Sequence, residues 1–237
     1  MRPSQPPHPG RNWALFLDID GTLLDIAPGP RAVVVPEGLQ QILLAACQFL
    51  AGALALVSGR PLEDIDRLMA PLRLPCAAEH GAVLRFSDGS VRSHSEDYAV
   101  PAGLRDRMRE KVHKWPGAVL EEKQFNVVIH FRQVPNFAVE IGKFANAVAW
   151  EAGPQFEALP ARMAFEVRHR NLNKGSALRA FMTKIPFVAR VPVFVGDDVT
   201  DNDGFAASRD LGGLALEVSE AFDGEPRKVR HWLQTFS

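Results

Sequence analysis

Residues 13–24, WALFLDIDGTLL, decide the fold that we expect for this chain. Residues 13–19 form a short and largely apolar run, which is typical of a strand buried on both faces of a parallel sheet. Two carboxylates, Asp18 and Asp20, stand at the carboxyl end of this run, and Gly21 allows a tight turn directly after them. The stretch predicts a buried parallel strand that presents acidic side chains at one edge of a sheet.

The same kind of run returns twice along the chain. Residues 53–60, ALALVSGR, and residues 191–198, VPVFVGDD, are apolar stretches that end in polar residues. Apolar residues at helical spacing predict helices over residues 36–50 and 61–72. This alternation of strand and helix is typical of a parallel sheet with helices on both faces and right-handed crossovers.

The middle of the chain follows a different pattern. Helical spacing of apolar residues predicts helices over residues 100–115 and 137–149. Alternation at period two over residues 118–132 indicates one half-buried face, as antiparallel sheets show, and residues 160–170 are predicted to form a further strand. These elements predict a compact α+β unit inserted into an α/β domain.

The predicted organisation therefore has three parts. A flexible tail, rich in proline and polar residues, is expected over residues 1–12. A Rossmann-like α/β core domain with a parallel sheet is expected over residues 13–91 and 170–237. A smaller α+β cap domain is expected over residues 92–169.

Composition excludes several classes of protein. The 237 residues carry 27 Lys and Arg against 28 Asp and Glu, a net charge of −1, so there is no basic excess for a nucleic-acid partner. No apolar run approaches the roughly 18 residues of a membrane span, and the first residues lack the pattern of a secretory signal. We expect a cytoplasmic protein with no membrane partner, in which Cys47 and Cys76 are buried, reduced thiols.

Two clusters of polar residues stand at the carboxyl ends of the first two predicted strands, the edge at which open α/β sheets bind ligands. Asp18 could attack phosphorus as a nucleophile, and Asp20 could serve as general acid and then base; alone, the pair could also be turn residues. Ser58, with the amides of Gly59 and Arg60, could hold a phosphate oxygen. Taken alone, Ser58 is more typical of a helix N-cap.

Two further clusters lie later in the chain. Asn173 is typical of an N-cap, and Lys174 falls in the first helical turn, where its charge opposes the helix dipole unless an anion or carboxylate is near. A solvated surface lysine is the alternative. Residues 197–203 carry four carboxylates, which repel one another unless a cation lies among them, and such oxygen ligands suit Mg²⁺. A solvated acidic loop is the alternative there.

The order of these clusters, DxDGT, SGR, NKG and GDDxTD, resembles the haloacid dehalogenase superfamily of phosphotransferases over the whole α/β core. The resemblance implies that Asp18 is the nucleophile and Asp20 the general acid/base. It also implies that Ser58 and Lys174 hold the transferred phosphoryl group.

The same resemblance implies a Mg²⁺ cofactor. Asp197 would bind the metal together with Asp18 and the backbone carbonyl of Asp20, and Asp201 would support it through water. An acidic fourth cluster and Asp at position 20 favour the phosphatase branch over the dehalogenase branch, which uses no metal.

Within that superfamily the chain resembles the trehalose-6-phosphate phosphatase family. The shared stretches are AEHGA at 78–82, LEEK at 120–123, HFR at 130–132, FEVR at 165–168 and GDDVTD at 196–201. This resemblance implies Mg²⁺-dependent hydrolysis of trehalose 6-phosphate through an aspartyl-phosphate, with Glu121, Lys123 and Glu166 of the cap bonding the sugar hydroxyls. The chain departs from the family at Asn202, usually Glu, and at His169, usually Pro.

Several alternatives stay open at this level. Glu121, Lys123 and Glu166 could be exposed strand charges, and the sugar could be another glycosyl phosphate such as sucrose phosphate or mannosylglycerate phosphate. A phosphomutase would return the phosphoryl group to the sugar. A non-catalytic sugar-phosphate binding module would have no need of a nucleophile such as Asp18.

Overall fold

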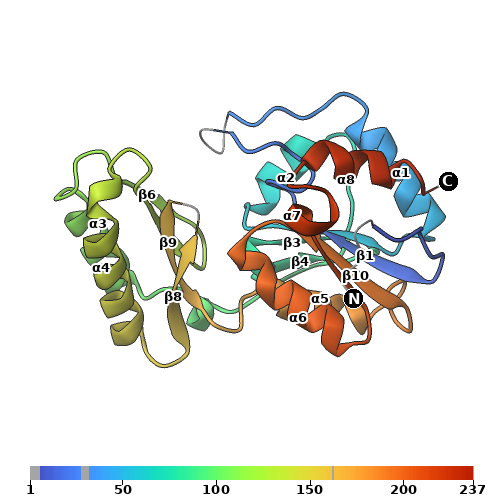
Figure 1. Ribbon diagram of the computed structural model, residues 1–237. Coiled ribbons are helices and arrows are strands. Elements are labelled where there is room, and N and C mark those ends of the chain that lie inside the picture. The colour runs from blue at the N-terminus through green and yellow to red at the C-terminus, as the bar shows by residue number, and fades with distance from the viewer. Residues whose placement is uncertain (1–5, 28–31, 162, 237) are drawn as a thin grey trace. The chain divides into compact units, whose positions relative to one another are not determined.

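The structure is a computed structural model that describes residues 6–27, 32–161 and 163–236. The chain separates into two compact units (Figure 1). One, the core unit, comprises Met1–Arg92 and Asn173–Ser237; the other, the inserted unit, comprises Ser93–Leu172.

The core unit is built on a seven-stranded sheet in the order β11-β10-β1-β2-β3-β4-β5. Its strands are β1 (Trp13–Leu17), β2 (Leu54–Val57), β3 (Cys76–Ala78), β4 (Val83–Arg85), β5 (Val91–Ser93), β10 (Val191–Gly196) and β11 (Leu214–Glu217). The five strands from β11 to β3 pair in parallel, and β4 runs antiparallel to β3. Because β1 lies between β2 and β10, the carboxyl ends of three motif-bearing strands meet at one edge of the sheet.

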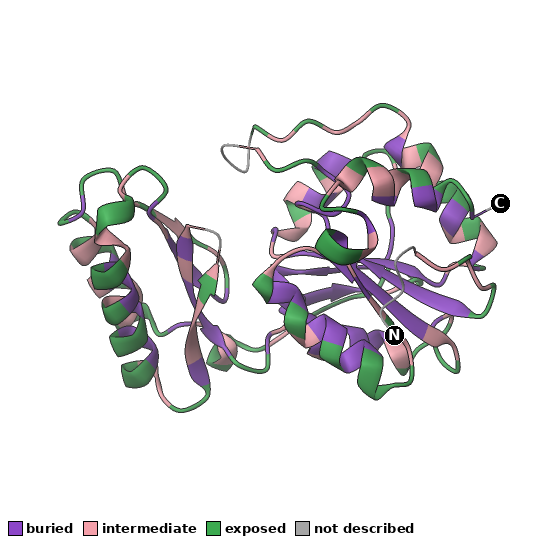
Figure 2. Cartoon of the chain, in the orientation of Figure 1, coloured by how far each residue is buried: buried purple, intermediate pink, exposed green. Residues whose placement is uncertain are grey.

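Helices cover both faces of this sheet. They are α1 (Leu39–Phe49), α2 (Leu62–Met69), α5 (Lys174–Met182), α6 (Asn202–Asp210), α7 (Val218–Ala221) and α8 (Pro226–Leu233), with 3₁₀ turns η1 (Glu79–Gly81) and η4 (Val199–Asp201). Helices α5 and α6 lie on one face, and α1, α2 and α8 lie on the other (Figure 1). Every residue of β1 and β2 is buried, as Figure 2 shows, which explains why these strands read as continuous apolar runs.

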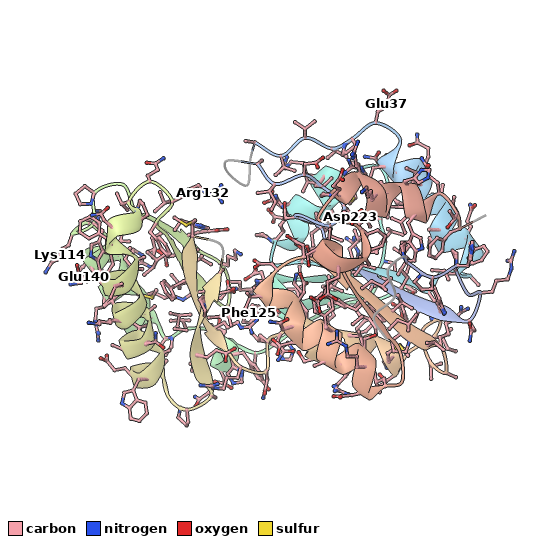
Figure 3. The ribbon with its side chains drawn as sticks, viewed as in Figure 1. Glu37, Lys114, Phe125, Arg132, Glu140 and Asp223 are labelled. Atoms are coloured by element: carbon pink, nitrogen blue, oxygen red, sulfur yellow. The ribbon has the colours of Figure 1, made fainter. Side chains whose placement is uncertain are left out.

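The inserted unit is an antiparallel sheet with helices on one face. Its strands, in the order β6-β7-β9-β8, are β6 (Val119–Glu122), β7 (Val127–His130), β8 (Phe156–Ala161) and β9 (Ala164–His169). Its helices are α3 (Ala102–Val112) and α4 (Ala138–Ala152), with 3₁₀ turns η2 (Glu96–Tyr98) and η3 (Pro135–Phe137). Val127, Ile129 and Val167 belong to the hydrophobic core of this unit. The labelled Lys114 and Glu140 lie on the outer side of the two helices, away from the sheet (Figure 3).

The predicted class, a parallel α/β core with an α+β unit, is confirmed, and three details differ. Residues 118–132 form two paired strands, β6 and β7, instead of one alternating stretch. Residues 156–169 form the hairpin of β8 and β9 where we predicted one strand. Strand β11 was not predicted, because its four residues, LALE, follow two glycines and form too short a pattern on their own.

Residues 7 and 11 of the predicted tail contact the core unit. The indole Nε1 of Trp232 donates a hydrogen bond of 2.9 Å to the carbonyl of Pro7, and the Arg11 guanidinium lies 4.5 Å from the Phe49 ring centre. Residues 1–5 of the predicted tail lie outside the described residues.

None of the helices within residues 6–27, 32–161 and 163–236 combines the length and the hydropathy that a bilayer crossing requires. The two cysteines are free thiols, as expected. Cys76 is buried, whereas Cys47 is only half-buried because it lies on the side of α1 that partly faces solvent.

Candidate active site

Two acidic motifs lie side by side because their strands pair. Leu17 of β1 is in register with Val195 of β10, and the amide of Asp18 donates a 3.0 Å hydrogen bond to the Val195 carbonyl. Asp18 follows β1 and Asp197 follows β10, so the pairing brings carboxylates 179 residues apart to one place. This point is also where the strand order reverses, the position at which open α/β sheets bind ligands.

Asp18, Asp197 and Asp201 form a carboxylate cluster. Each offers an oxygen, and these oxygens lie within 4.8 Å of one another. Asp201 is fully buried and its Oδ2 accepts hydrogen bonds of 3.0 Å from the amides of Asp197 and Asp198, which hold it in place. Gly21 lies against the Asp197 carboxylate so closely that a Cβ there would come within 2.1 Å of Oδ2, which explains the glycine at this position.

Lys174 binds this cluster. Its Nζ lies 2.6 Å from Oδ1 of Asp18 and 2.6 Å from Oδ1 of Asp201, and the residue is 2% exposed. It occupies the first turn of α5, which Asn173 caps in a reciprocal pair of hydrogen bonds with Ser176. The surface-lysine alternative is therefore wrong, and the unfavourable position in the helix dipole is offset by two carboxylates.

The electrostatics of the cluster are unbalanced. Burial raises the pKa of Asp18 well above its usual value, Lys174 opposes that shift, and Asp201 and Asp197 add to it. Burial and then Asp201 raise the pKa of Asp197 to about 6. Burial alone would lower the pKa of Lys174, but Asp18 and Asp201 outweigh burial and raise it. Three carboxylates thus face one ammonium group, and a divalent cation with hard oxygen ligands, such as Mg²⁺, fits this donor set.

Asp20 lies outside the carboxylate cluster and is held by Arg60. The guanidinium donates from Nε and Nη2 to the two oxygens of Asp20 at 2.6 and 2.7 Å. The Arg60 side chain is 8% exposed and that of Asp20 is 39% exposed. Both carboxylate oxygens of Asp20 are thus engaged by the forked guanidinium of Arg60.

Ser58 is buried at the carboxyl end of β2, next to β1 in the sheet. Its amide donates to the Ala77 carbonyl at 2.9 Å, and its Oγ accepts from the Arg60 amide at 3.2 Å. Helix α2 begins after Pro61 without a side-chain cap, so the N-cap alternative for Ser58 is wrong.

The three predicted sugar-binding residues lie in the inserted unit. Glu121, Val128 and Glu166 are in register across β6, β7 and β9, so Glu121 and Glu166 share one face of the sheet. Oε2 of Glu121 lies 2.7 Å from Nε2 of His130, and the Lys123 ammonium lies 3.8 Å from Oε1 of Glu121.

Glu166 is 3% exposed and accepts a short hydrogen bond from the Asn126 side-chain amide. Because Val127, Ile129 and Val167 point to the helices, the row of Glu121 and Glu166 lies on the opposite face of the sheet. The structure therefore brings Glu121, Lys123 and Glu166 together, as one polar group on the face without helices.

Sequence reasoning missed the roles of Arg60 and Asn126. The sequence suggested a role for the Arg60 backbone amide but none for its guanidinium, and it suggested no role for Asn126. Each is a polar side chain that contacts a predicted site residue, Asp20 or Glu166. Both contacts join residues 40 positions apart, so no local pattern predicts them. The only signal in the sequence was that each residue lies next to a motif.

Comparison with solved structures supports this description of the fold. The C-terminal domain of the trehalose-6-phosphate phosphatase of C. albicans superposes with a TM-score of 0.78 at 20% identity, covering 94% of this chain and 91% of that one. Together with the family match and the relatives described next, this fold and site define a phosphatase of the haloacid dehalogenase superfamily with an inserted cap. The same sequence comparisons show that the protein is an enzyme.

The family follows from the sequence comparisons. The trehalose-phosphatase family model matches residues 16–230, and the chain belongs to that family. A probable trehalose-phosphate phosphatase of Sinorhizobium fredii is 40% identical over 207 residues, which cover 87% of this chain and 78% of the relative. The trehalose-6-phosphate phosphatase of Escherichia coli is 35% identical over 215 residues, 91% of this chain and 80% of the relative.

Proposed function

We propose that this enzyme hydrolyses trehalose 6-phosphate to trehalose and phosphate through an aspartyl-phosphate on Asp18, with Mg²⁺ bound by Asp18, Asp197 and the Asp20 backbone carbonyl and supported by Asp201. The observation that carries this proposal is the carboxylate cluster with Lys174 bonded to both Asp18 and Asp201 at 2.6 Å. A buried nucleophile with an ammonium group beside it is what attack on an anionic phosphoryl group requires.

In the first step a carboxylate oxygen of Asp18 forms a bond to phosphorus as the bond from phosphorus to the sugar oxygen breaks. Lys174 holds Asp18 in orientation and, with Ser58, binds the phosphoryl oxygens. Bound Mg²⁺ would supply positive charge that offsets the charge of the phosphoryl group. The cluster's excess of negative charge in the absence of a cation explains why these residues would bind one.

Asp20 supplies and then removes a proton. In its acid form it protonates the leaving sugar oxygen; afterwards it takes a proton from the water that attacks phosphorus, which releases phosphate and regenerates Asp18. Because both oxygens of Asp20 accept hydrogen bonds from Arg60, the acid role requires at least one of these bonds to open when substrate binds. Arg60 would thus hold Asp20 in place between turnovers.

We propose that Glu121, Lys123 and Glu166 bind the sugar hydroxyls. Their position on the helix-free face of the inserted sheet supports this, because charge-assisted hydrogen bonds from a preorganised polar group discriminate strongly among sugars.

The free thiols of the described chain fit a reducing cytoplasm, which is the location that we propose.

The test is phosphate release from trehalose 6-phosphate, glucose 6-phosphate, sucrose 6-phosphate and a nucleotide, each with Mg²⁺ and with EDTA. We expect release from trehalose 6-phosphate alone, abolished by EDTA. The Asp18→Asn variant should fold and show no turnover. Preference for another sugar phosphate would keep the core chemistry and overturn the sugar assignment, whereas turnover by Asp18→Asn would overturn the nucleophile.

A further inference from the structure

The turn η1 holds a buried pair of polar residues that the proposed mechanism does not use. Glu79 and His80 are each 6% exposed and follow β3 directly. Both have left-handed backbones, with φ of 45° and 58°, and Gly81 continues at 107°. A left-handed conformation is unfavourable for residues with a Cβ, and consecutive instances persist only where the surrounding structure imposes them.

One side of this turn lies against the loop that carries Ser58. The amide of His80 donates to the Ser58 carbonyl at 2.9 Å, and the amide of Glu79 donates to the Arg60 carbonyl at 3.0 Å. The imidazole lies over Gly59, since a Cβ on Gly59 would come within 2.4 Å of Nε2 of His80. The turn thus holds both ends of Ser58–Arg60, and the imidazole covers its middle.

The other side of the turn lies against the start of α5. A Cβ on Gly81 would come within 3.0 Å of Cβ of Ala177 and 3.1 Å of the Asn173 carbonyl. Asn173 is the N-cap of the helix whose first residue is Lys174. The turn η1 therefore contacts both the Ser58–Arg60 loop and the start of α5, which carry the two residues proposed to bind phosphate, Ser58 and Lys174.

We infer that His80 is a positioning residue, whose imidazole fixes the Ser58–Arg60 loop at its working distance from Lys174. This inference rests on the proposed roles of Ser58 and Lys174 in phosphate binding. Misplacement of a binding group by about 1 Å can cost two orders of magnitude in rate. Loss of the imidazole should therefore weaken phosphate binding and turnover even where the fold is unharmed.

The first test replaces the imidazole and retains the left-handed backbone. In His80→Gly the strain at φ 58° is relieved, and in His80→Asn the left-handed region is still tolerated. Asparagine keeps most of the volume, but its side chain is one bond too short to cover Gly59. We expect kcat/KM to fall at least tenfold in both variants, with folding verified by circular dichroism at the assay temperature. Ala51→Gly, which relieves a left-handed residue at φ 50° on the surface, is the matched control and should keep full activity.

The second test is a double-mutant cycle with Gly59, whose φ is not left-handed and therefore accepts alanine. In the native background Gly59→Ala should reduce kcat/KM about a hundredfold, because its Cβ meets the imidazole. In the His80→Gly or His80→Asn background, Gly59→Ala should reduce kcat/KM less than threefold. An equal loss in both backgrounds, or wild-type activity in His80→Gly and His80→Asn, would overturn the inference.

Two further readouts separate this inference from the proposed function. The inhibition constant of orthophosphate should rise at least fivefold in the His80 variants, while that of trehalose stays unchanged; a purely structural defect would move both. Hydrolysis of p-nitrophenyl phosphate needs no contact with a sugar. The ratio of kcat/KM between variant and wild type can therefore be measured with this substrate even if trehalose 6-phosphate is not the substrate. If the protein turns over neither substrate, calorimetry can measure the affinity for orthophosphate in the presence of Mg²⁺ and so compare the His80 variants with the wild type.

Discussion

At the scale of single residues, the site is dominated by charge confined to a small buried volume. Asp18, Asp197 and Asp201 share one ammonium group, that of Lys174. Burial of like charges without full compensation costs stability, so this cluster destabilises the metal-free protein. The residues proposed to hold the metal are thus unfavourable for the fold when no cation is bound.

The Asp197→Asn variant tests this strain. The pKa of Asp197 is about 6 in the folded protein against an ordinary 3.8, so the folded state binds more protons than the unfolded state between these values. Stability of the wild type in EDTA should therefore fall as pH rises from about 4 to about 6. We expect Asp197→Asn to raise the melting temperature in EDTA by a few degrees at pH 7, and less at pH 4.

Addition of Mg²⁺ provides the control for this prediction. It should raise the melting temperature of the wild type by mass action and have little effect on Asp197→Asn. A variant that melts below the wild type in EDTA at pH 7 would show that the carboxylate stabilises the fold.

The role of Arg60 can be tested with two substrates, one whose leaving group needs a proton and one whose leaving group does not. Its forked contact with Asp20 cannot be reproduced by lysine. We expect Arg60→Lys to lower kcat for trehalose 6-phosphate by roughly tenfold to a hundredfold with KM little changed, because Asp20 loses its orientation. The loss should be much smaller with p-nitrophenyl phosphate, whose leaving group departs without protonation. Equal losses on the two substrates would contradict a role through Asp20.

At the scale of elements, helix α5 connects stability with chemistry. Its N-cap, Asn173, accepts from the Ser176 amide at 2.8 Å, and Ser176 Oγ accepts in turn from the Asn173 amide. This cap fixes the first turn, and the first turn carries Lys174. The capped helix end therefore also sets the position of Lys174, a residue proposed to bind phosphate.

Replacement of the cap should affect both properties. We expect Asn173→Ala to lower the free energy of unfolding by about 1 kcal/mol, measured by urea denaturation, because a backbone donor loses its partner. It should also raise KM severalfold. Asn173→Asp, which can still cap, is the control and should retain most of the stability; equal destabilisation in both variants would argue against the cap.

At the scale of the whole molecule, the two units carry separate parts of the proposed reaction. The core unit holds the carboxylate cluster, and the inserted unit holds Glu121, Lys123 and Glu166. The hydrogen bond with His130 lowers the pKa of Glu121 despite its partial burial, so this carboxylate stays ionised over the working pH range. Ionised acceptors suit sugar hydroxyls.

This division predicts that substitutions of the proposed sugar-binding residues impair hydrolysis of a sugar phosphate but not of a phosphate ester without a sugar. Glu121→Gln and Glu166→Gln should raise KM for trehalose 6-phosphate tenfold or more, because charge-assisted bonds to hydroxyls are lost. Hydrolysis of p-nitrophenyl phosphate should be unchanged. Glu140→Gln, on the outer side of the helices of the same unit (Figure 3), is the matched control and should behave as wild type. A parallel loss on both substrates would place these glutamates outside sugar binding.

The sequence by itself determined the class of fold and the main acidic motifs. Buried parallel strands must be apolar throughout, and their polar ends must lie at one edge, so the runs before Asp18, Ser58 and Asp197 were readable without coordinates. The placement of Lys174 in a first helical turn left two interpretations, a nearby anion or carboxylate and a solvated lysine, between which the sequence alone did not decide. These signals are local, because each depends on the few residues around it.

Only the tertiary structure decided which side chains meet across the fold. The pairs of Arg60 with Asp20 and Asn126 with Glu166, and the turn of His80 against Gly59, join residues that are distant in sequence or separated by a strand. Strand β11 and the hairpin of β8 with β9 were likewise missed, because pairing with neighbours, rather than their own propensity, makes these short segments strands. Contacts of this kind depend on register and packing, which no local pattern encodes.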